Sequence, residues 1–270
     1  MADSPSRGRS PGDEERPDVH GIASRNLGAA RAPDSRFVSL PIMSVAKLSV
    51  SHQNYLRAIW NLGEWSADPV TTSAVAHKVG LRASTVSDAL KKLTEHGLVA
   101  HTPYGAIELT EQGRALAVEM VRRHRLIETF LVEMLGYRWD QVHDEAEHLE
   151  HAASDFMIDR LDDLLGHPSR DPHGDPIPAK DGTITPPDAV SLTTVPDGSR
   201  VRVERISDRD SGLLRFFADQ GIGVGVPLDV RSGGPYSGSV QAVLDDGARS
   251  VSLGQAATDA VWVSLGEVSS

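Results

Sequence analysis

The chain has 270 residues, no cysteine and a net charge of −11 from 27 basic and 38 acidic side chains. This length fits two or three domains, and a hydrophobic content of 39 % rules out wholesale disorder. The absence of cysteine excludes disulfides, iron–sulfur clusters and thiolate zinc sites, so a bound metal must use oxygen and nitrogen ligands. The acidic balance argues against constitutive polyanion binding through a basic surface.

The sequence has no apolar stretch of the roughly 20 residues that a membrane helix needs and no secretory signal peptide. We therefore expect a cytoplasmic protein without a membrane partner. Residues 1–48 are rich in Ser, Arg, Pro, Gly and Asp and show no apolar period. They cannot bury enough surface to offset the entropy of ordering, which predicts a disordered tail.

Residues 49–115 alternate helical patterns and turns. Helical periodicity predicts one helix from Ser51, a second over Val70–Val79, and a third capped by Ser84 or Thr85. The apolar alternation on both sides of the turn at 103–105 predicts a β-hairpin. Three helices followed by a hairpin predict a winged helix-turn-helix domain.

Residues 116–170 carry much of the acidic excess and read as helical. A long helix is expected from Thr110 to a stop at Gly136, and a further helix from about Trp139 to Leu165. The Pro-, Gly- and Asp-rich stretch that begins at Gly166 predicts irregular structure, with a linker over 171–189.

Residues 190–270 contain short strand patterns and one helix, expected over Leu213–Gln220. The strands are expected at Arg200–Ile206, Pro227–Val230, Ser239–Leu244, Ser250–Leu253 and Ala260–Leu265. They predict a small SH3-like β-barrel. The expected fold is mainly α with α+β parts, comprising a winged helix, a helical domain and this barrel.

Imidazoles and carboxylates recur at helical spacing in the middle of the chain: His124, Glu128, His143, Glu147, Glu150 and His151. Residues three or four apart share one helix face, so two clusters are expected on neighbouring helices, as in helical metal sites. The alternative is a solvated polar face, which is our interpretation of Asp144, Glu145 and His148. Unpaired carboxylates on one face repel one another, which favours the metal interpretation.

The sequence gives no positive sign of an enzyme or of a small-molecule substrate. The His and Glu residues do not have the spacing of zinc peptidases. A phosphate-cradling Gly loop and a Gly-x-Ser-x-Gly turn are also lacking, and Gly221–Gly225 reads as an ordinary turn.

The third expected helix has the pattern of a DNA recognition helix. The N-terminal part of its polar face has small side chains, which can approach base edges. The part that follows has cationic side chains, which can contact phosphates. The candidate DNA-binding residues, including one at the hairpin tip, are Arg82, Ser84, Thr85, Ser87, Lys91, Lys92 and Tyr104. The alternatives are an ordinary solvent face or a winged helix that binds protein.

Several runs together resemble the diphtheria-toxin-repressor family over about residues 50–265. They are Tyr55–Trp60, Ser84–Ser87, Gly97–Val99, His124–Glu128, Val142–Glu147, Leu149–His151 and Asp171–Pro178. The resemblance implies a metal-dependent bacterial transcriptional repressor that dimerises through its helical domain, with the manganese-responsive branch the most similar. An iron-responsive repressor of this family is the alternative, and a helical hydrolase or metal buffer that does not bind DNA is a second one.

The resemblance also implies two metal sites per subunit. A regulatory site would comprise Asn54, Glu147, Glu150 and His151, and an ancillary site His124, Glu128 and His143, with Asp208 or Asp210 nearby. Glu147 stands where iron-responsive members place Cys, and Asn54 where members place Met or Asp. Because these donors are oxygen and nitrogen alone, we expect Mn²⁺, with Fe²⁺ as the alternative.

The helical domain has more large apolar side chains than one thin layer of helices needs to bury, so some should meet a second subunit. The candidates are Phe130, Leu131, Met134, Leu135, Phe156, Leu161 and Leu165. Each could instead belong to the core of its own domain. A symmetric homodimer is expected to bind palindromic operator DNA.

Overall fold

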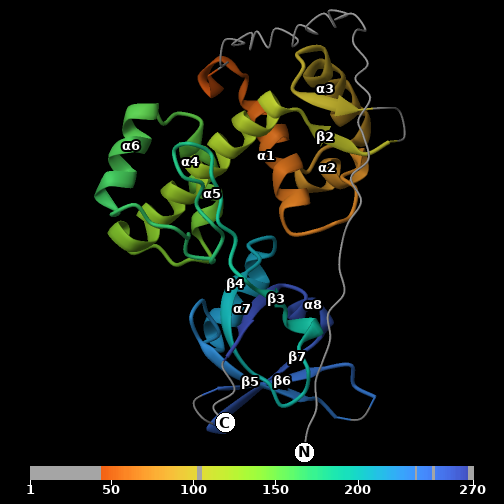
Figure 1. Ribbon diagram of the computed structural model, residues 1–270, viewed down its shortest axis with the longest axis vertical. Helices are drawn as coiled ribbons and strands as arrows, with labels where there is room; N and C mark the ends of the chain where they lie inside the picture. Colours follow the sequence, from red (N-terminus) through yellow and green to blue (C-terminus); the bar gives the residue numbers. More distant parts are fainter. Residues whose placement is uncertain (1–43, 102–104, 235, 245–246, 267–270) are drawn as a thin grey trace, which may run out of the picture. The chain divides into compact units, whose positions relative to one another are not determined.

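A computed structural model describes residues 44–101, 105–234, 236–244 and 247–266 (Figure 1). Residues 1–43 of the expected tail lie outside the described residues. The remainder of that range is ordered, because Val45–Lys47 form a 3-10 turn in which Val45 is only 2 % exposed. The expected disorder is therefore wrong for 44–48, where one apolar side chain reaches the core that follows.

The N-terminal part of the described chain contains three helices and a two-stranded antiparallel hairpin. The elements are α1 (Val50–Glu64), α2 (Thr72–Lys78), α3 (Ala83–Glu95), β1 (Val99–His101) and β2 (Ile107–Leu109). Leu56, Leu90 and Leu93 are fully buried in the core that these elements share. This arrangement is the expected winged helix-turn-helix.

The side chains that begin these helices differ from one to the next. Ser49 and Thr71 accept hydrogen bonds from the backbone N–H groups of the first turns of α1 and α2. Helix α3 begins earlier than expected, after Arg82 and without a side-chain cap. The expected cap at Ser84 or Thr85 is therefore wrong, because both residues lie inside the first turn with exposed side chains.

Helix α4 (Glu111–Leu135) runs from a Thr110 cap to Gly136, as its periodicity predicted. Its first turn passes very close to the hairpin, since a Cβ at Gly113 would lie 1.8 Å from the backbone oxygen of Leu98. Glycine at this position therefore allows α4 to pack directly against the winged helix.

The single helix expected over Trp139–Leu165 is in fact two helices, α5 (Val142–Glu150) and α6 (Asp155–Leu164). The Ser154 hydroxyl accepts a hydrogen bond from the N–H of Met157 and so caps a new helix after a turn. The break allows both helices to pack against α4 around a shared apolar core.

The irregular segment after Gly166 is ordered by its own polar groups. Asp171 Oδ1 accepts hydrogen bonds from the N–H groups of His173 and Asp175. Gly174 has a φ of +88°, and a Cβ there would lie 2.0 Å from the Glu204 carbonyl oxygen. The loop therefore lies directly against strand β4 (Arg200–Ile206), and the Ile206 N–H donates to the carbonyl of His173.

The C-terminal part is a six-stranded antiparallel sheet in the order β3-β8-β4-β5-β6-β7, with an apolar core of its own. The strands are β3 (Val190–Ser191), β4 (Arg200–Ile206), β5 (Pro227–Ser232), β6 (Val240–Leu244), β7 (Arg249–Leu253) and β8 (Val261–Leu265). The helices are η2 (Leu192–Thr194), α7 (Ser211–Asp219) and α8 (Gln255–Thr258). The sequence patterns did not predict the short elements β3, η2 and α8. None of the helices among the described residues is long and apolar enough to cross a membrane.

Candidate metal centre

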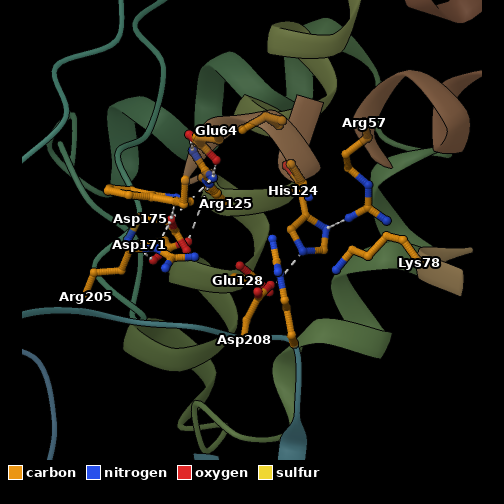
Figure 2. A pocket seen from close by; sticks show the side chains of 14 residues that line it. Arg57, Glu64, Lys78, His124, Arg125, Glu128, Asp171, Asp175, Arg205 and Asp208 are labelled. Carbon is orange, nitrogen blue, oxygen red and sulfur yellow. Dashed lines mark hydrogen bonds and ion pairs between the residues drawn. The ribbon is translucent and has the colours of Figure 1, made fainter. Parts of the chain in front are cut away.

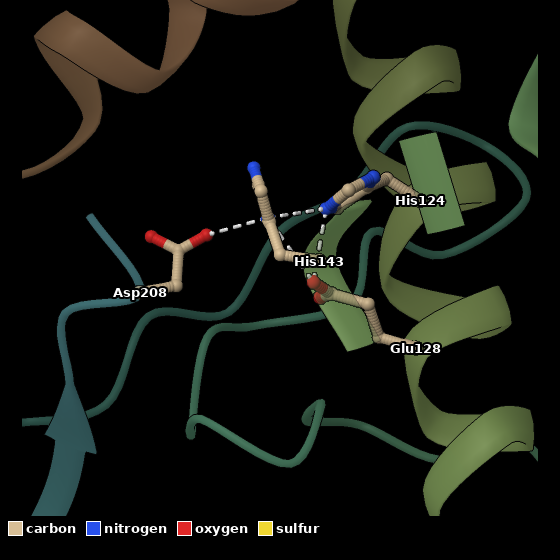
Figure 3. A group of neighbouring side chains, drawn as sticks. All are labelled: His124, Glu128, His143 and Asp208. Carbon is tan, nitrogen blue, oxygen red and sulfur yellow. Dashed lines mark hydrogen bonds and ion pairs between the residues drawn. The ribbon is translucent and has the colours of Figure 1, made fainter. Parts of the chain in front are cut away.

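One cluster of potential ligands joins α4, α5 and the loop after β4 (Figure 3). His124 Nε2 lies 3.0 Å from Glu128 Oε1, and both side chains project from α4 one turn apart. His143 Nδ1 on α5 lies 3.2 Å from His124 Nε2 and 3.3 Å from Asp208 Oδ2. Donor atoms of all four residues lie within 4.8 Å of one another. The structure thus gathers His124, Glu128 and His143 with Asp208, whereas Asp210 caps α7.

The charged side chains in this cluster shift one another's pKa. Burial would lower the pKa of His124, but the carboxylates of Glu128 and Glu150 outweigh it and raise the pKa to about 9. Burial would raise the pKa of Glu128, but His124 outweighs it and holds this pKa well below its usual range. The pKa of Asp208 is also lowered, because His143 and Lys78 outweigh the effect of burial. In the absence of a metal, a protonated His124 therefore balances part of the carboxylate charge.

The second oxygen of Glu128 faces a buried histidine from the irregular loop. His173 Nδ1 lies 3.8 Å from Glu128 Oε2 and has no hydrogen-bond partner, while His173 Nε2 lies 2.8 Å from the Trp139 carbonyl. Burial would lower the pKa of His173, but Glu128 and Asp171 outweigh it and raise the pKa. His173 therefore lies behind Glu128 at ion-pair distance.

A second cluster joins α1 to α5. Asn54 Nδ2 lies 3.5 Å from Glu147 Oε1, and His151 Nε2 lies 3.4 Å from Glu150 Oε1. The two clusters meet at His124, whose Nδ1 lies 2.6 Å from Glu150 Oε2 while its Nε2 faces the first cluster. Asn54 thus contacts Glu147, and Glu150 contacts His151, which forms two pairs between α1 and the end of α5.

The donor atoms of this second cluster fit a cation. Asn54 Oδ1, Glu150 Oε1 and His151 Nε2 are buried without a hydrogen-bond partner, and such atoms are costly unless something binds them. His151 Nδ1 lies 2.6 Å from Gln53 Oε1 and donates to it, which leaves the lone pair of Nε2 on the side of the carboxylates. Burial lowers the pKa of His151, so the ring is neutral and ready to act as a ligand.

Comparison with known proteins bears on these clusters. Residues 47–107 match the family model "Iron dependent repressor, N-terminal DNA binding domain", and residues 110–179 match "Iron dependent repressor, metal binding and dimerisation domain". Residues 190–265 match the FeoA domain. The diphtheria toxin repressor of Corynebacterium efficiens is 31 % identical over 212 residues, which cover 73 % of this chain and 92 % of that protein. The chain belongs to the diphtheria-toxin-repressor family.

Other members of the diphtheria-toxin-repressor family are also similar to this chain. The iron-dependent repressor IdeR of Mycobacterium leprae is 34 % identical over 181 residues, covering 62 % of this chain and 78 % of that protein. A solved manganese-dependent transcriptional repressor in complex with manganese is 50 % identical, with a TM-score of 0.75 over 80 % of this chain and 100 % of that one. The manganese regulator SloR is 29 % identical, with a TM-score of 0.68 over 80 % of this chain and 98 % of that one. This repressor therefore has the DNA-binding, metal-binding and FeoA domains of a metal-dependent transcriptional regulator, not of an enzyme.

The predicted DNA-binding residues of this family member lie mostly on one exposed surface. Arg82, Ser84, Thr85, Ser87, Lys91 and Lys92 are all exposed at the start and along one side of α3. Tyr104 lies outside the described residues. The opposite side of α3 is buried through Val86, Leu90 and Leu93, so the polar side is free to contact a ligand.

The predicted dimer residues fall into two groups. Phe156, at 76 % exposed, and Met134 and Leu135 present apolar surface. Leu131 and Leu161 are only 2 % and 6 % exposed within one chain, and their assignment to the interface is wrong because they fill the core between α4 and α6. Phe130 and Leu165 are partly buried against the same core. Met157 and Leu164, which the sequence analysis did not single out, extend the exposed apolar surface of α6.

A polar pocket beside the first cluster contains a second group of charges (Figure 2). Arg125 on α4 makes two hydrogen bonds to the Glu64 carboxylate at the end of α1, at 3.0 and 2.5 Å. Arg205 on β4 donates to Asp175 Oδ1 at 2.6 Å and lies over the rings of Trp65 and Trp262, at 4.4 and 4.2 Å from their centroids. These contacts join α1, the irregular loop and the sheet around the cluster.

Four residues that shape the centre were not predicted from the sequence. Gln53 sets the tautomer of His151, His173 backs Glu128, Arg57 contacts both clusters, and Arg205 joins the sheet to α1. Arg57 lies three residues after Asn54 on α1, whereas His173 and Arg205 have no helical spacing to the ligands. The adjacency of Gln53 to Asn54 was the other local signal.

Proposed function

We propose that this repressor is activated by Mn²⁺, with Fe²⁺ as the second candidate. The observation that supports this proposal is the set of three buried donor atoms without a hydrogen-bond partner, Asn54 Oδ1, Glu150 Oε1 and His151 Nε2. With Glu147 they form a set of oxygen and nitrogen donors without sulfur, which suits a harder divalent ion. The 50 % identity to a manganese-dependent repressor in complex with manganese points the same way.

The position of the donors explains how binding can control DNA recognition. Asn54 belongs to α1 of the winged helix, whereas Glu147, Glu150 and His151 belong to α5 and its end. When bound, the divalent ion supplies two positive charges that draw the donors of α1 and α5 together. The ligands on both helices then hold the winged helix in one orientation, which shifts the population toward the DNA-binding arrangement.

We further propose an ancillary site of His124, Glu128, His143 and Asp208. Asp208 follows β4, so the site includes a donor from the FeoA domain as well as donors from α4 and α5. Filling it would stabilise the contact between these parts of the chain. Two sites per subunit are therefore proposed, and they share the ring of His124 as a common neighbour.

The active form is proposed to be a homodimer on palindromic operator DNA. The exposed apolar residues of α4 and α6, Met134, Leu135 and Phe156, form the proposed interface. Two-fold symmetry would place two copies of α3 in successive major grooves, about 34 Å apart. The Phe156→Glu variant should dissociate at micromolar concentration in analytical ultracentrifugation, and a fully dimeric variant would contradict this interface.

The deciding experiment is capture of sheared genomic DNA by the purified protein at fixed salt, followed by sequencing. It is run in parallel with chelator, Mn²⁺, anaerobic Fe²⁺ and Zn²⁺. The salt concentration is fixed because phosphate contacts make every affinity depend on it. Enrichment of a few palindromic sites with Mn²⁺ supports the proposal. Enrichment with Fe²⁺ alone would identify iron as the activating ion. If none of the metals gives enrichment, the proposal is contradicted, and a helical metalloprotein that does not bind DNA remains.

The same assay tests the regulatory site. Glu147→Ala should lose the metal-dependent enrichment, because it removes one donor of the proposed site. Glu145→Ala is the matched control, since Glu145 is an exposed glutamate on the same helix. Retention of full enrichment by Glu147→Ala would remove this residue from the regulatory site.

A further inference from the structure

A buried arginine lies among the proposed regulatory ligands. Arg57, on α1 one turn after Asn54, has a side chain that is only 8 % exposed. Its Nη2 lies 3.3 Å from Glu147 Oε1 and its Nε 3.4 Å from Glu150 Oε1. Its Nη1 lies 2.7 Å from His124 Nδ1 (Figure 2). One guanidinium thus contacts two proposed regulatory ligands and one proposed ancillary ligand.

The contacts of Arg57 compete with those of a metal ion. Glu150 Oε1 faces both Arg57 Nε and His151 Nε2, each at 3.4 Å, so the guanidinium occupies the side of the carboxylate that a cation would use. An arginine cannot lose its charge in a protein. It therefore balances the buried carboxylates for as long as it stays, and it repels a second cation at the same oxygens.

The imidazole of His124 shares Glu150 with Arg57. His124 Nδ1 lies 2.6 Å from Glu150 Oε2 and 2.7 Å from Arg57 Nη1. The guanidinium therefore lies where the two proposed sites meet, against a carboxylate of the regulatory site and a ring of the ancillary site.

We propose that Arg57 is an internal counter-cation that holds Glu147 and Glu150 in the metal-free protein and sets the Mn²⁺ concentration at which the regulatory site fills. The inference rests on the proposed function, since it concerns the same site. It adds that the response threshold is set by a cation of the chain itself, in competition with the ion. The same side chain also contacts His124 of the ancillary site.

The test is the affinity of the full-length protein for Mn²⁺ alone, followed by the electron paramagnetic resonance signal of the free ion. Arg57→Gln removes the charge and should tighten Mn²⁺ binding at the regulatory site at least about tenfold, because the carboxylates no longer have a competing partner. The metal-free variant should also melt at a lower temperature than the native protein and gain more from Mn²⁺, since the buried Glu150 loses its arginine partner. Arg122→Gln is the control, because Arg122 is an equally buried arginine of α4 that pairs with Asp162 instead. It should lose stability without a change in Mn²⁺ affinity.

Unchanged or weaker Mn²⁺ binding by Arg57→Gln would overturn the inference. If that variant does not fold without metal, Arg57→Lys decides, because an ammonium group keeps the charge but cannot contact Glu147, Glu150 and His124 together. Tighter Mn²⁺ binding by the lysine variant supports the inference, and equal or weaker binding overturns it. Failure of the proposed function is a separate result. It appears as a lack of metal-dependent DNA capture by the native protein, whereas the Mn²⁺ affinities are measured with protein and ion alone.

Discussion

The pKa of His124 predicts that the two proposed metal sites respond differently to pH. Burial opposes the proton on this ring, but Glu128 and Glu150 prevail and raise the pKa to about 9. The proton must leave before the ring can serve as a ligand. At pH 7 about 1 % of the rings are neutral, so binding at the ancillary site should be about 100-fold weaker than above pH 9, or about 2.7 kcal/mol.

The regulatory site should lack this dependence on His124. The pKa of His151 is lowered by burial, and that of Glu147 is lowered because Arg57 outweighs burial. Both groups therefore have the protonation state of a ligand at neutral pH. The pH of the medium should change the ratio of the two affinities.

The assay is a titration with Mn²⁺ at about pH 6, 7 and 8, in buffers of different ionisation enthalpy so that calorimetry counts the protons released. The weaker class of sites should tighten about tenfold per pH unit and release close to one proton. His148→Asn is the control, because His148 is exposed and contacts the backbone of its own helix. Two classes of sites with the same affinity at pH 6 and pH 8 would refute the reasoning.

The same shift predicts the sign of a stability effect in the metal-free protein. The pKa of His124 is higher in the folded state than the ordinary histidine pKa of about 6.5. Its contribution to stability is therefore fully present below about pH 6.5 and is lost as the pH rises through about 9.

Three further predictions concern the parts of the chain around the centre. Arg205→Met removes the cation between two tryptophans and leaves Asp175 buried without this partner, so stability should fall by about 3–5 kcal/mol in urea unfolding followed by fluorescence; an unchanged midpoint would show that the contact contributes nothing. Gly113→Ala places a methyl group against the Leu98 carbonyl and should cost about 1–3 kcal/mol by the same assay, whereas a neutral result would mean that α4 can shift freely. Lys91→Ala and Lys92→Ala should each reduce the slope of log Kd against log salt for DNA by about 1, and identical slopes would place both side chains away from phosphate.

Most secondary structure could be predicted because it depends on contacts between residues close in the chain. Helix α4 and strand β4 lie within a residue of their predicted bounds, since the periodic burial of their side chains is written in the local pattern. The break between α5 and α6 was missed, because apolar residues continue across it and only the cap at Ser154 marks a new start. Strand β3 is two residues long and exists through its pairing with β8, which no local pattern reveals.

The ligand residues on one helix followed from sequence spacing, since His124 and Glu128 share a face of α4 by helical geometry alone. The all-oxygen-and-nitrogen donor set followed from composition, because the chain has no cysteine. Only the tertiary structure decided which residues far away in the chain add donors to that set, and which compete with a metal for it. Asp208 rather than Asp210 reaches the first cluster, Gln53 fixes the tautomer of His151, and Arg57 occupies the second cluster. These contacts join residues far apart in the chain, and their energies depend on distance and burial, which exist only once the elements have packed.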